Sequence, residues 1–223
     1  LRLPRLGQPH ALVFDETYYA KDALSLLKFG YERKMLSDAN EKLLLGNTSI
    51  FDKGAEYVVH PPVGKWVIAL GEHIFGATPF GWRIMVALLG IATVLITGRA
   101  ARRLMRSNVI GTLTALLMAL DGLNIAMSRT ALLDTTLTFF VMCSFAMLLI
   151  DRDRATSDGT RWARWGMTLA LGLAVSTKWS GVYFAAAFGL LMMSWDFGRR
   201  IALSTSGART AINTWLRRDV LPA

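Results

Sequence analysis

The chain has 223 residues, of which 53% are hydrophobic and only 18% are charged, and its mean hydropathy of +0.37 exceeds that of an ordinary soluble domain. The formal net charge of +9 does not indicate nucleic-acid binding, because the arginines gather at the ends of apolar runs and no basic stripe is interleaved with aromatic residues. The composition therefore indicates a membrane protein and predicts no nucleic-acid partner.

Near the start of the chain, the stretch FDETYY places the adjacent carboxylates Asp15 and Glu16 ahead of a predicted helix over Thr17–Phe29. Apolar residues recur there at helical spacing, and Gly30 ends the pattern. One interpretation is structural: Asp15 caps the helix, and Glu16 lies near the positive end of its dipole. The other is chemical: Asp15 is a general base with a carboxylate beside it. The two interpretations are compatible.

The rest of residues 1–78 is predicted to be an extramembrane region. Residues 33–56 are polar and loop-like, and His60 precedes a double proline that predicts a rigid extended corner. The following VGKWVIALGEHIFG predicts an amphipathic helix on the membrane surface, with Lys65 and Glu72 facing water. His60 has no metal-ligand spacing around it, so no metal site is predicted.

Residues 79–195 are predicted to contain about five transmembrane helices. The apolar runs 79–98, 109–127 and 131–150 are each long enough to cross a bilayer core, which needs about 20 residues. The stretch 165–195 is interrupted by TKWSG, which predicts two short helices that turn there. Residues 196–223 are predicted to be a basic tail.

The distribution of arginine predicts the orientation. Residues 99–107, 151–164 and 196–223 together hold 13 Arg and 5 Asp, so the positive-inside rule makes that side cytoplasmic and turns residues 1–78 outward. We expect a multi-pass protein of the plasma membrane with an extracytoplasmic site. A further helix is expected before Leu1, and others after the tail.

Several ionisable residues lie close to or inside the predicted spans. Lys65 and Arg83 are at the outer rim, where long basic side chains either reach toward lipid headgroups or bind a phosphate. Asp121 and Asp134 are costly inside a membrane and bracket Arg129, so an ion pair with that arginine is the structural interpretation. The alternative is a transporter or channel whose path these aspartates line together with Lys178.

Five ordered blocks resemble the protein O-mannosyltransferases, especially the actinobacterial members: HALVFDETYYAKDALSLLKFGYE, YVVHPPVGKWVIALGEHIFG, GWRIMVALLG, MSRTALLDTTLTFF and LGLAVSTKWSGVYF. The resemblance covers residues 8 to 200. It implies an all-α, polytopic GT-C glycosyltransferase bundle with an extracytoplasmic loop that contains amphipathic helices. It also implies inverting transfer of mannose from a polyprenyl phosphate to Ser or Thr of proteins being translocated. The chain would be the N-terminal half of such an enzyme.

The same resemblance implies roles for individual residues. Asp15 matches the catalytic aspartate, Glu16 the carboxylate beside it, and Arg83 an arginine that handles the donor phosphate. Apart from the resemblance, Lys65 or Arg129 is a candidate helper of Arg83, because the charge on a leaving phosphate needs fixed cations. A second set is expected to line the site: His60, Arg129 and Asp134. The expected partners are the membrane, polyprenyl-phosphate-mannose, secreted acceptor proteins and the secretion translocon. No cofactor is predicted besides the lipid-linked donor. Another GT-C sugar transferase remains an alternative.

Overall fold

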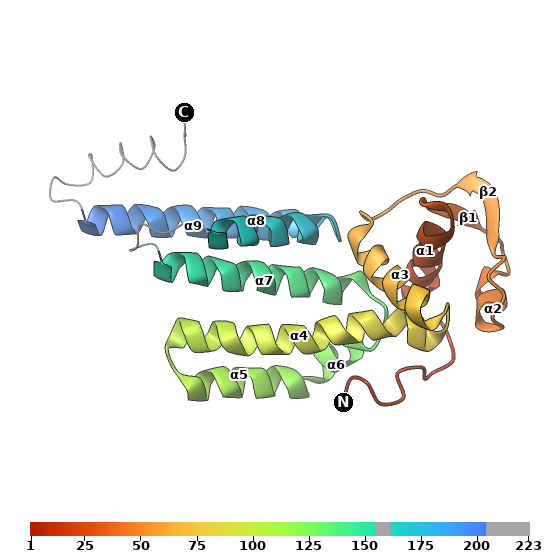
Figure 1. Cartoon of the computed structure of the whole chain (residues 1–223), viewed down its shortest axis with the longest axis horizontal. Helices are drawn as coiled ribbons and strands as arrows, with labels where there is room; N and C mark the ends of the chain where they lie inside the picture. Colours follow the sequence, from red (N-terminus) through yellow and green to blue (C-terminus); the bar gives the residue numbers. More distant parts are fainter. Residues whose placement is uncertain (155–161, 204–223) are drawn as a thin grey trace.

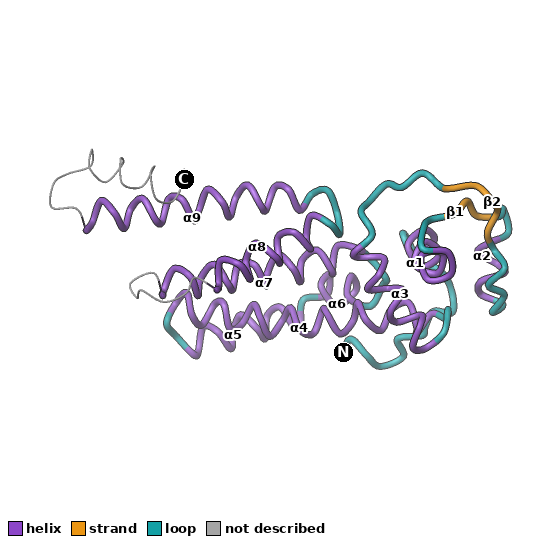
Figure 2. Tube along the Cα trace, turned by 45° about the horizontal axis from the view of Figure 1, so that its top comes forward, coloured by secondary structure: helices purple, strands orange, loops and turns teal. Residues whose placement is uncertain are grey.

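The computed structural model describes residues 1–154 and 162–203, and it divides them into a helical bundle and a smaller region at one end of that bundle. Figures 1 and 2 show α4, α5, α7, α8 and α9 running alongside one another, with α1, α2, α3 and the strands gathered at one end. The elements in chain order are α1 (Glu16–Phe29), β1 (Arg33–Met35), α2 (Ala39–Leu44), β2 (Phe51–Ala55), α3 (Val63–Phe75), α4 (Pro79–Met105), α5 (Asn108–Leu120), α6 (Gly122–Ser128), α7 (Leu133–Arg154), α8 (Trp162–Val175) and α9 (Gly181–Leu203).

The first predicted helix is confirmed as α1. It ends where Gly30 adopts a left-handed conformation, with φ of 76°, and donates its N–H to the Leu26 carbonyl. Asp15 is at the N-cap position, but its side chain makes no capping hydrogen bond. The predicted loop over 33–56 is wrong in part, because β1 and β2 form an antiparallel two-stranded sheet with α2 between them.

The predicted helix after the double proline is confirmed as α3. Its position on the membrane surface stays a prediction, and the prediction for its charged residues is wrong. Lys65 and Glu72 are only 1% and 3% exposed, because they face inward toward the protein. The outward face is apolar: Trp66 is 56% and Ile74 55% exposed. An apolar outer face suits a helix that lies against a membrane. The polar face, which the sequence predicts to be in water, faces the protein interior instead.

The bundle contains three helices that are individually long and apolar enough to cross a membrane: α4, α7 and α9. The predicted span 109–127 is broken, because α5 and α6 meet at a bend of 64°, and this bent pair would make a fourth span. The turn at TKWSG is confirmed. However, α8 has only 14 described residues, whereas α9 has 23 and is not short. Within the described residues, the count is therefore three or four rather than five. Most of the predicted basic tail lies outside those residues.

A buried core ties residues 1–78 to the bundle. The side chains come from α1, α2, α3, α4 and the start of α7, and include Tyr19, Leu24, Ile68, Trp82 and Leu133. Because this core joins residues far apart in sequence, α1 is held rigidly against the outer end of α4 and α7. The two carboxylates before and at the start of α1 therefore have fixed positions relative to the bundle.

Candidate active site

Glu16 and Arg83 form a buried ion pair beneath the start of α1. The Arg83 Nε donates to Glu16 Oε1 at 2.7 Å, and a terminal nitrogen of Arg83 donates to Oε2 at 2.7 Å. The same carboxylate accepts the backbone N–H groups of Val13 and Ala131, each at 2.9 Å. Glu16 is completely buried, so this carboxylate joins the N-terminal segment, α4 and the turn before α7.

All five N–H groups of Arg83 are used in this arrangement. Two go to Glu16, and the remaining three go to the carbonyls of Leu6, Pro9 and Ala11. With Arg83 only 1% exposed, a donor phosphate could reach it only if one of these bonds broke. The expectation that Arg83 handles the phosphate stays a prediction, whereas the role that the structure gives it is to hold the segment preceding α1.

Asp15 lies one residue earlier and differs from Glu16 in burial and in ion pairing. Its side chain is half-buried rather than enclosed, and no ion pair with a basic residue is formed by it in the described part of the chain. One helical turn further on is Tyr19, whose ring centroid is 6.4 Å from that of His60. Burial and then the Asp15 charge raise the pKa of Tyr19 to about 12, so this hydroxyl stays protonated.

His60 and Lys178 reach the same place from two further segments. Burial lowers the pKa of His60, and the charges of Lys178 and Lys65 lower it further, so the imidazole is neutral at pH 7. Lys178 pairs with Asp134 at 2.7 Å, and both side chains are partly exposed, at 25% and 39%. Asp15, Tyr19, His60, Asp134 and Lys178 together are called the rim cluster below.

The backbone explains why these segments meet. The Val63 N–H donates to the Ser176 carbonyl at 3.0 Å, and the Trp179 indole donates to the Val59 carbonyl at 3.0 Å. These two bonds fasten the turn between α8 and α9 onto the corner that carries His60. The sequence predicts a turn at TKWSG and so places Lys178 at the end of the bundle, where the transporter interpretation has it line a path. The sequence does not predict its pairing with Asp134, because the two residues are 44 positions apart in the chain.

Lys65 and Arg129 have other partners. Lys65 is enclosed between Asp22 at 3.0 Å and Glu32 at 2.9 Å, which removes it from any exposed phosphate. The predicted pairing of Arg129 with Asp121 or Asp134 is wrong, since Arg129 donates to carbonyls of residues 1, 2, 4 and 5. Asp121 instead caps α6 by accepting the Asn124 N–H at 2.8 Å.

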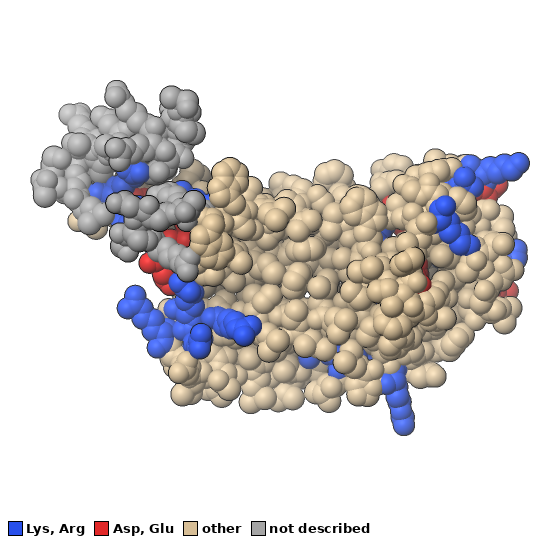
Figure 3. All heavy atoms as spheres, in the orientation of Figure 1, with Lys and Arg blue, Asp and Glu red and all other residues tan. Residues whose placement is uncertain are grey.

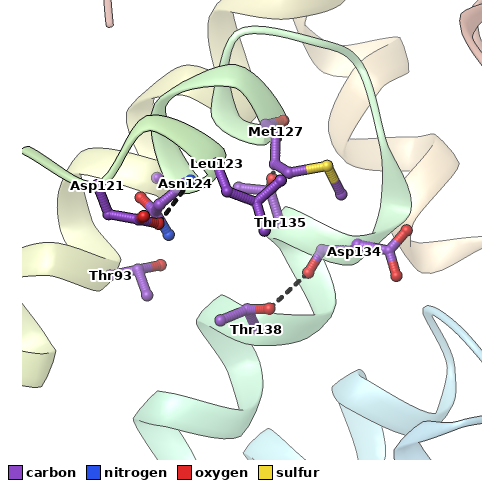
Figure 4. A pocket seen from close by; sticks show the side chains of 9 residues that line it. Thr93, Asp121, Leu123, Asn124, Met127, Asp134, Thr135 and Thr138 are labelled. Atoms are coloured by element: carbon purple, nitrogen blue, oxygen red, sulfur yellow. Dashed lines mark hydrogen bonds between the residues drawn. The ribbon is translucent and has the colours of Figure 1, made fainter. Parts of the chain in front are cut away.

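A cavity of about 170 Å³ lies between α4, α6 and α7, beside the rim cluster. Figure 4 shows Thr93, Asp121 and Thr138 around it, whereas the Asp134 carboxylate points away from Thr138. Asp134 thus lines the cavity and also reaches Lys178. Among the residues that the structure describes, no three His, Cys, Asp or Glu side chains are grouped so that they could hold a metal ion.

Comparisons with known proteins identify the family and the fold. The family model described as dolichyl-phosphate-mannose-protein mannosyltransferase matches residues 1–217. A polyprenol-phosphate-mannose–protein mannosyltransferase of Mycobacterium tuberculosis is 37% identical over all of this chain and 42% of its own length. The homologue of the same name in Corynebacterium glutamicum is 38% identical over 76% of this chain and 36% of its own length.

The chain thus spans about four-tenths of the length of these curated relatives. Among solved structures, apo ArnT from Cupriavidus metallidurans aligns with a TM-score of 0.64 at 22% identity, over 93% of this chain and 36% of ArnT. This likeness concerns the fold, and together with the apolar helices it confirms the expected all-α, multi-pass bundle. From the extent of the sequence match, the chain belongs to the dolichyl-phosphate-mannose-protein mannosyltransferase family.

Proposed function

We propose that the protein transfers mannose from polyprenyl-phosphate-mannose to Ser or Thr hydroxyls of secreted proteins. Family membership supports the class of reaction, and the names of the mycobacterial and corynebacterial relatives support the donor. Because the chain spans less than half of those relatives, the activity belongs to the whole protein. The residues described here supply the base and one cation.

The observation that carries the proposal is the contrast between two adjacent carboxylates. Glu16 is completely buried and holds Arg83 and two backbone amides, so its four hydrogen bonds leave it no capacity to accept a proton from a substrate. Asp15 is half-buried at the edge of the rim cluster, without a basic partner among the described residues. A base must be able to reach the proton it removes, and of these two adjacent carboxylates Asp15 meets that condition.

In the proposed reaction, Asp15 takes the proton of a Ser or Thr hydroxyl as its oxygen attacks the anomeric carbon of mannose. The bond from that carbon to the phosphate oxygen breaks, and the polyprenyl phosphate leaves with an additional negative charge. Lys178 is our candidate for stabilising that charge, because it is the partly exposed cation of the rim cluster, held in place by Asp134. A single displacement inverts the anomeric centre.

The location of the reaction follows from the lipid tail. Each buried CH₂ contributes roughly 0.8 kcal/mol to keeping a polyprenyl chain in the bilayer, so the phosphate must meet the protein at a membrane surface. The rim cluster lies at the end of the bundle opposite the arginine-rich ends of α4 and α9. The positive-inside rule then supports an extracytoplasmic site in the plasma membrane, where acceptors leave the translocon.

The test is mannose transfer by the full-length protein in liposomes, from polyprenyl-phosphate-mannose to a Ser/Thr peptide. Asp15→Asn should lower the turnover at least about a hundredfold, because general base catalysis contributes about 10² to 10⁴. Asp52→Asn, in the exposed strand β2, removes the same charge and should retain full activity. Retained transfer by Asp15→Asn would overturn the assignment of the base. Faster transfer from another sugar donor, or to a lipid acceptor, would overturn the substrates.

A further inference from the structure

A second polar groove lies at the opposite end of the bundle from the rim cluster. It occupies about 490 Å³ on the surface of α4 and α5, within the range of small-molecule sites. Its polar side chains are Arg99, Arg102, Asn108 and Thr112, and no acidic residue lines it. Figure 3 shows blue basic side chains gathered at this end of α4 and α5.

The two arginines in the groove differ from Arg103 and Arg152, which lie at the same end of the bundle. Arg103, next in sequence, pairs with Asp153 at 2.7 Å, and Arg152 pairs with the same aspartate at 2.9 Å. Arg99 and Arg102 are exposed and have no acidic partner in the part of the chain that the structure describes. Being three residues apart on α4, they lie on the same face of the helix. Two guanidinium groups in this position are available to an anion.

Close helix packing brings α5 to these arginines. A Cβ on Gly111 would lie 2.6 Å from the Cβ of Arg102 and 2.9 Å from the Gly98 carbonyl, so only glycine permits this approach. The first turn of α5, capped by Ser107, therefore begins directly beside the arginine stems. Its free N–H groups and positive dipole end favour a negative charge in the groove.

Apolar side chains surround the groove on the sides that would face lipid. Leu95, Val109 and Leu113 are 56%, 67% and 50% exposed, and α4 is long and apolar enough to cross a membrane. A free anion would gain nothing from these side chains, whereas the acyl chains of a phospholipid would cover them. Cationic pockets between helices at the cytoplasmic surface are suited to anionic lipid headgroups.

We propose that the groove formed by Arg99, Arg102 and the first turn of α5 binds the phosphate of an anionic phospholipid in the cytoplasmic leaflet. This site is separate from the one that would hold the polyprenyl-linked donor, since it lies at the other end of the bundle. Bound lipid would fasten the α4–α5 hairpin, whose two helices are separated by two residues, Arg106 and Ser107, and meet at Gly98 and Gly111.

The experiment is native mass spectrometry of the delipidated full-length protein titrated with phosphatidylglycerol or with phosphatidylcholine of the same acyl chains. The wild type should bind phosphatidylglycerol at least tenfold more tightly. Arg99→Gln/Arg102→Gln should weaken that binding about thirtyfold, since each juxtamembrane arginine contributes about fivefold. The matched control is Arg103→Gln/Arg152→Gln, which removes two charges at the same end and should change binding less than about twofold.

Two further arms separate the sources of the phosphate and guard against misfolding. Glycerol phosphate should not compete at tenfold excess over the lipid, and phosphatidylglycerol should raise the Tm of the wild type and of Arg99→Lys/Arg102→Lys, but not of the Gln variant. The proposal is overturned if both lipids bind equally, if the control double variant loses binding as much as the groove variant, or if glycerol phosphate competes as well as lipid does.

Discussion

The contrast between Asp15 and Glu16 leads to opposite effects of two neighbouring substitutions. Glu16→Gln replaces one of two carboxylate oxygens, each of which accepts two hydrogen bonds, with an NH₂ group that faces donors. It also leaves the Arg83 charge buried at 1% exposure without a counter-ion. Removing one partner of a buried ion pair costs about 3 to 5 kcal/mol, so we expect the Tm to fall by about 10 °C.

The assay is thermal unfolding of the full-length protein in detergent, followed by tryptophan fluorescence, alongside mannose transfer. Asp15→Asn removes the same charge one residue away and should keep the Tm within about 2 °C while lowering transfer at least about a hundredfold. Adding Arg83→Met to Glu16→Gln should recover part of the lost stability, because no lone charge then stays buried. Recovery will be incomplete, since three carbonyls lose their donor. A Glu16→Gln variant as stable as Asp15→Asn would refute the reasoning.

Three other substitutions test separate features of the structure. Burial raises the pKa of Glu72 well above its ordinary value, and both of its carboxylate oxygens lack a partner in the described residues. The wild type therefore has its full free energy of unfolding below about pH 4.5, where Glu72 is protonated, and loses part of it as the pH rises and the buried carboxylate ionises. Glu72→Gln should unfold at a higher temperature than wild type at pH 8, and the difference in Tm should be smaller at pH 5. Gly71→Ala would place a Cβ 2.3 Å from the Gly81 carbonyl and should lower the Tm by several degrees, whereas Gly172→Ala, with nothing within 4 Å, should leave it unchanged or raise it. Lys178→Met should lower mannose transfer at least about tenfold, with partial activity in Lys178→Arg and an unchanged Tm in both; full activity of the Met variant would remove Lys178 from the site.

The sequence predicted α1 and α3 well because helical periodicity and glycine placement are local signals. It misplaced the charged side of α3 for a physical reason. At a membrane surface, the apolar stripe faces lipid, so the polar stripe is free to face a protein interior that contains matching charges. Lys65 has Asp22 and Glu32 there, and this pairing joins segments whose contact no periodicity reveals.

The break between α5 and α6 is a second feature that hydropathy did not predict. Residues 109–127 are apolar throughout, which predicts one span, yet Asp121 ends α5 and its side chain caps α6. The dipeptide Asp121-Gly122 breaks the helix, whereas the hydropathy of the run predicts that Asp121 lies inside a continuous span. The sequence could not predict the ion pairs of the candidate site. Several acidic residues are available to Arg83 and Lys178, and only the tertiary structure determines that they pair with Glu16 and Asp134.

The hydrogen bond from the Ala131 N–H to Glu16 joins residues 115 apart in the chain, and this has a consequence for biogenesis. Ribosomes deliver the outer loop long before the turn that precedes α7, so the loop waits at the membrane surface without its last anchor. If Asp15 is the base, as proposed above, it reaches its final position only after the turn that precedes α7 has been delivered. A nascent polypeptide halted earlier would expose the segment before α1 to proteases, and its cleavage would report the moment at which assembly is complete.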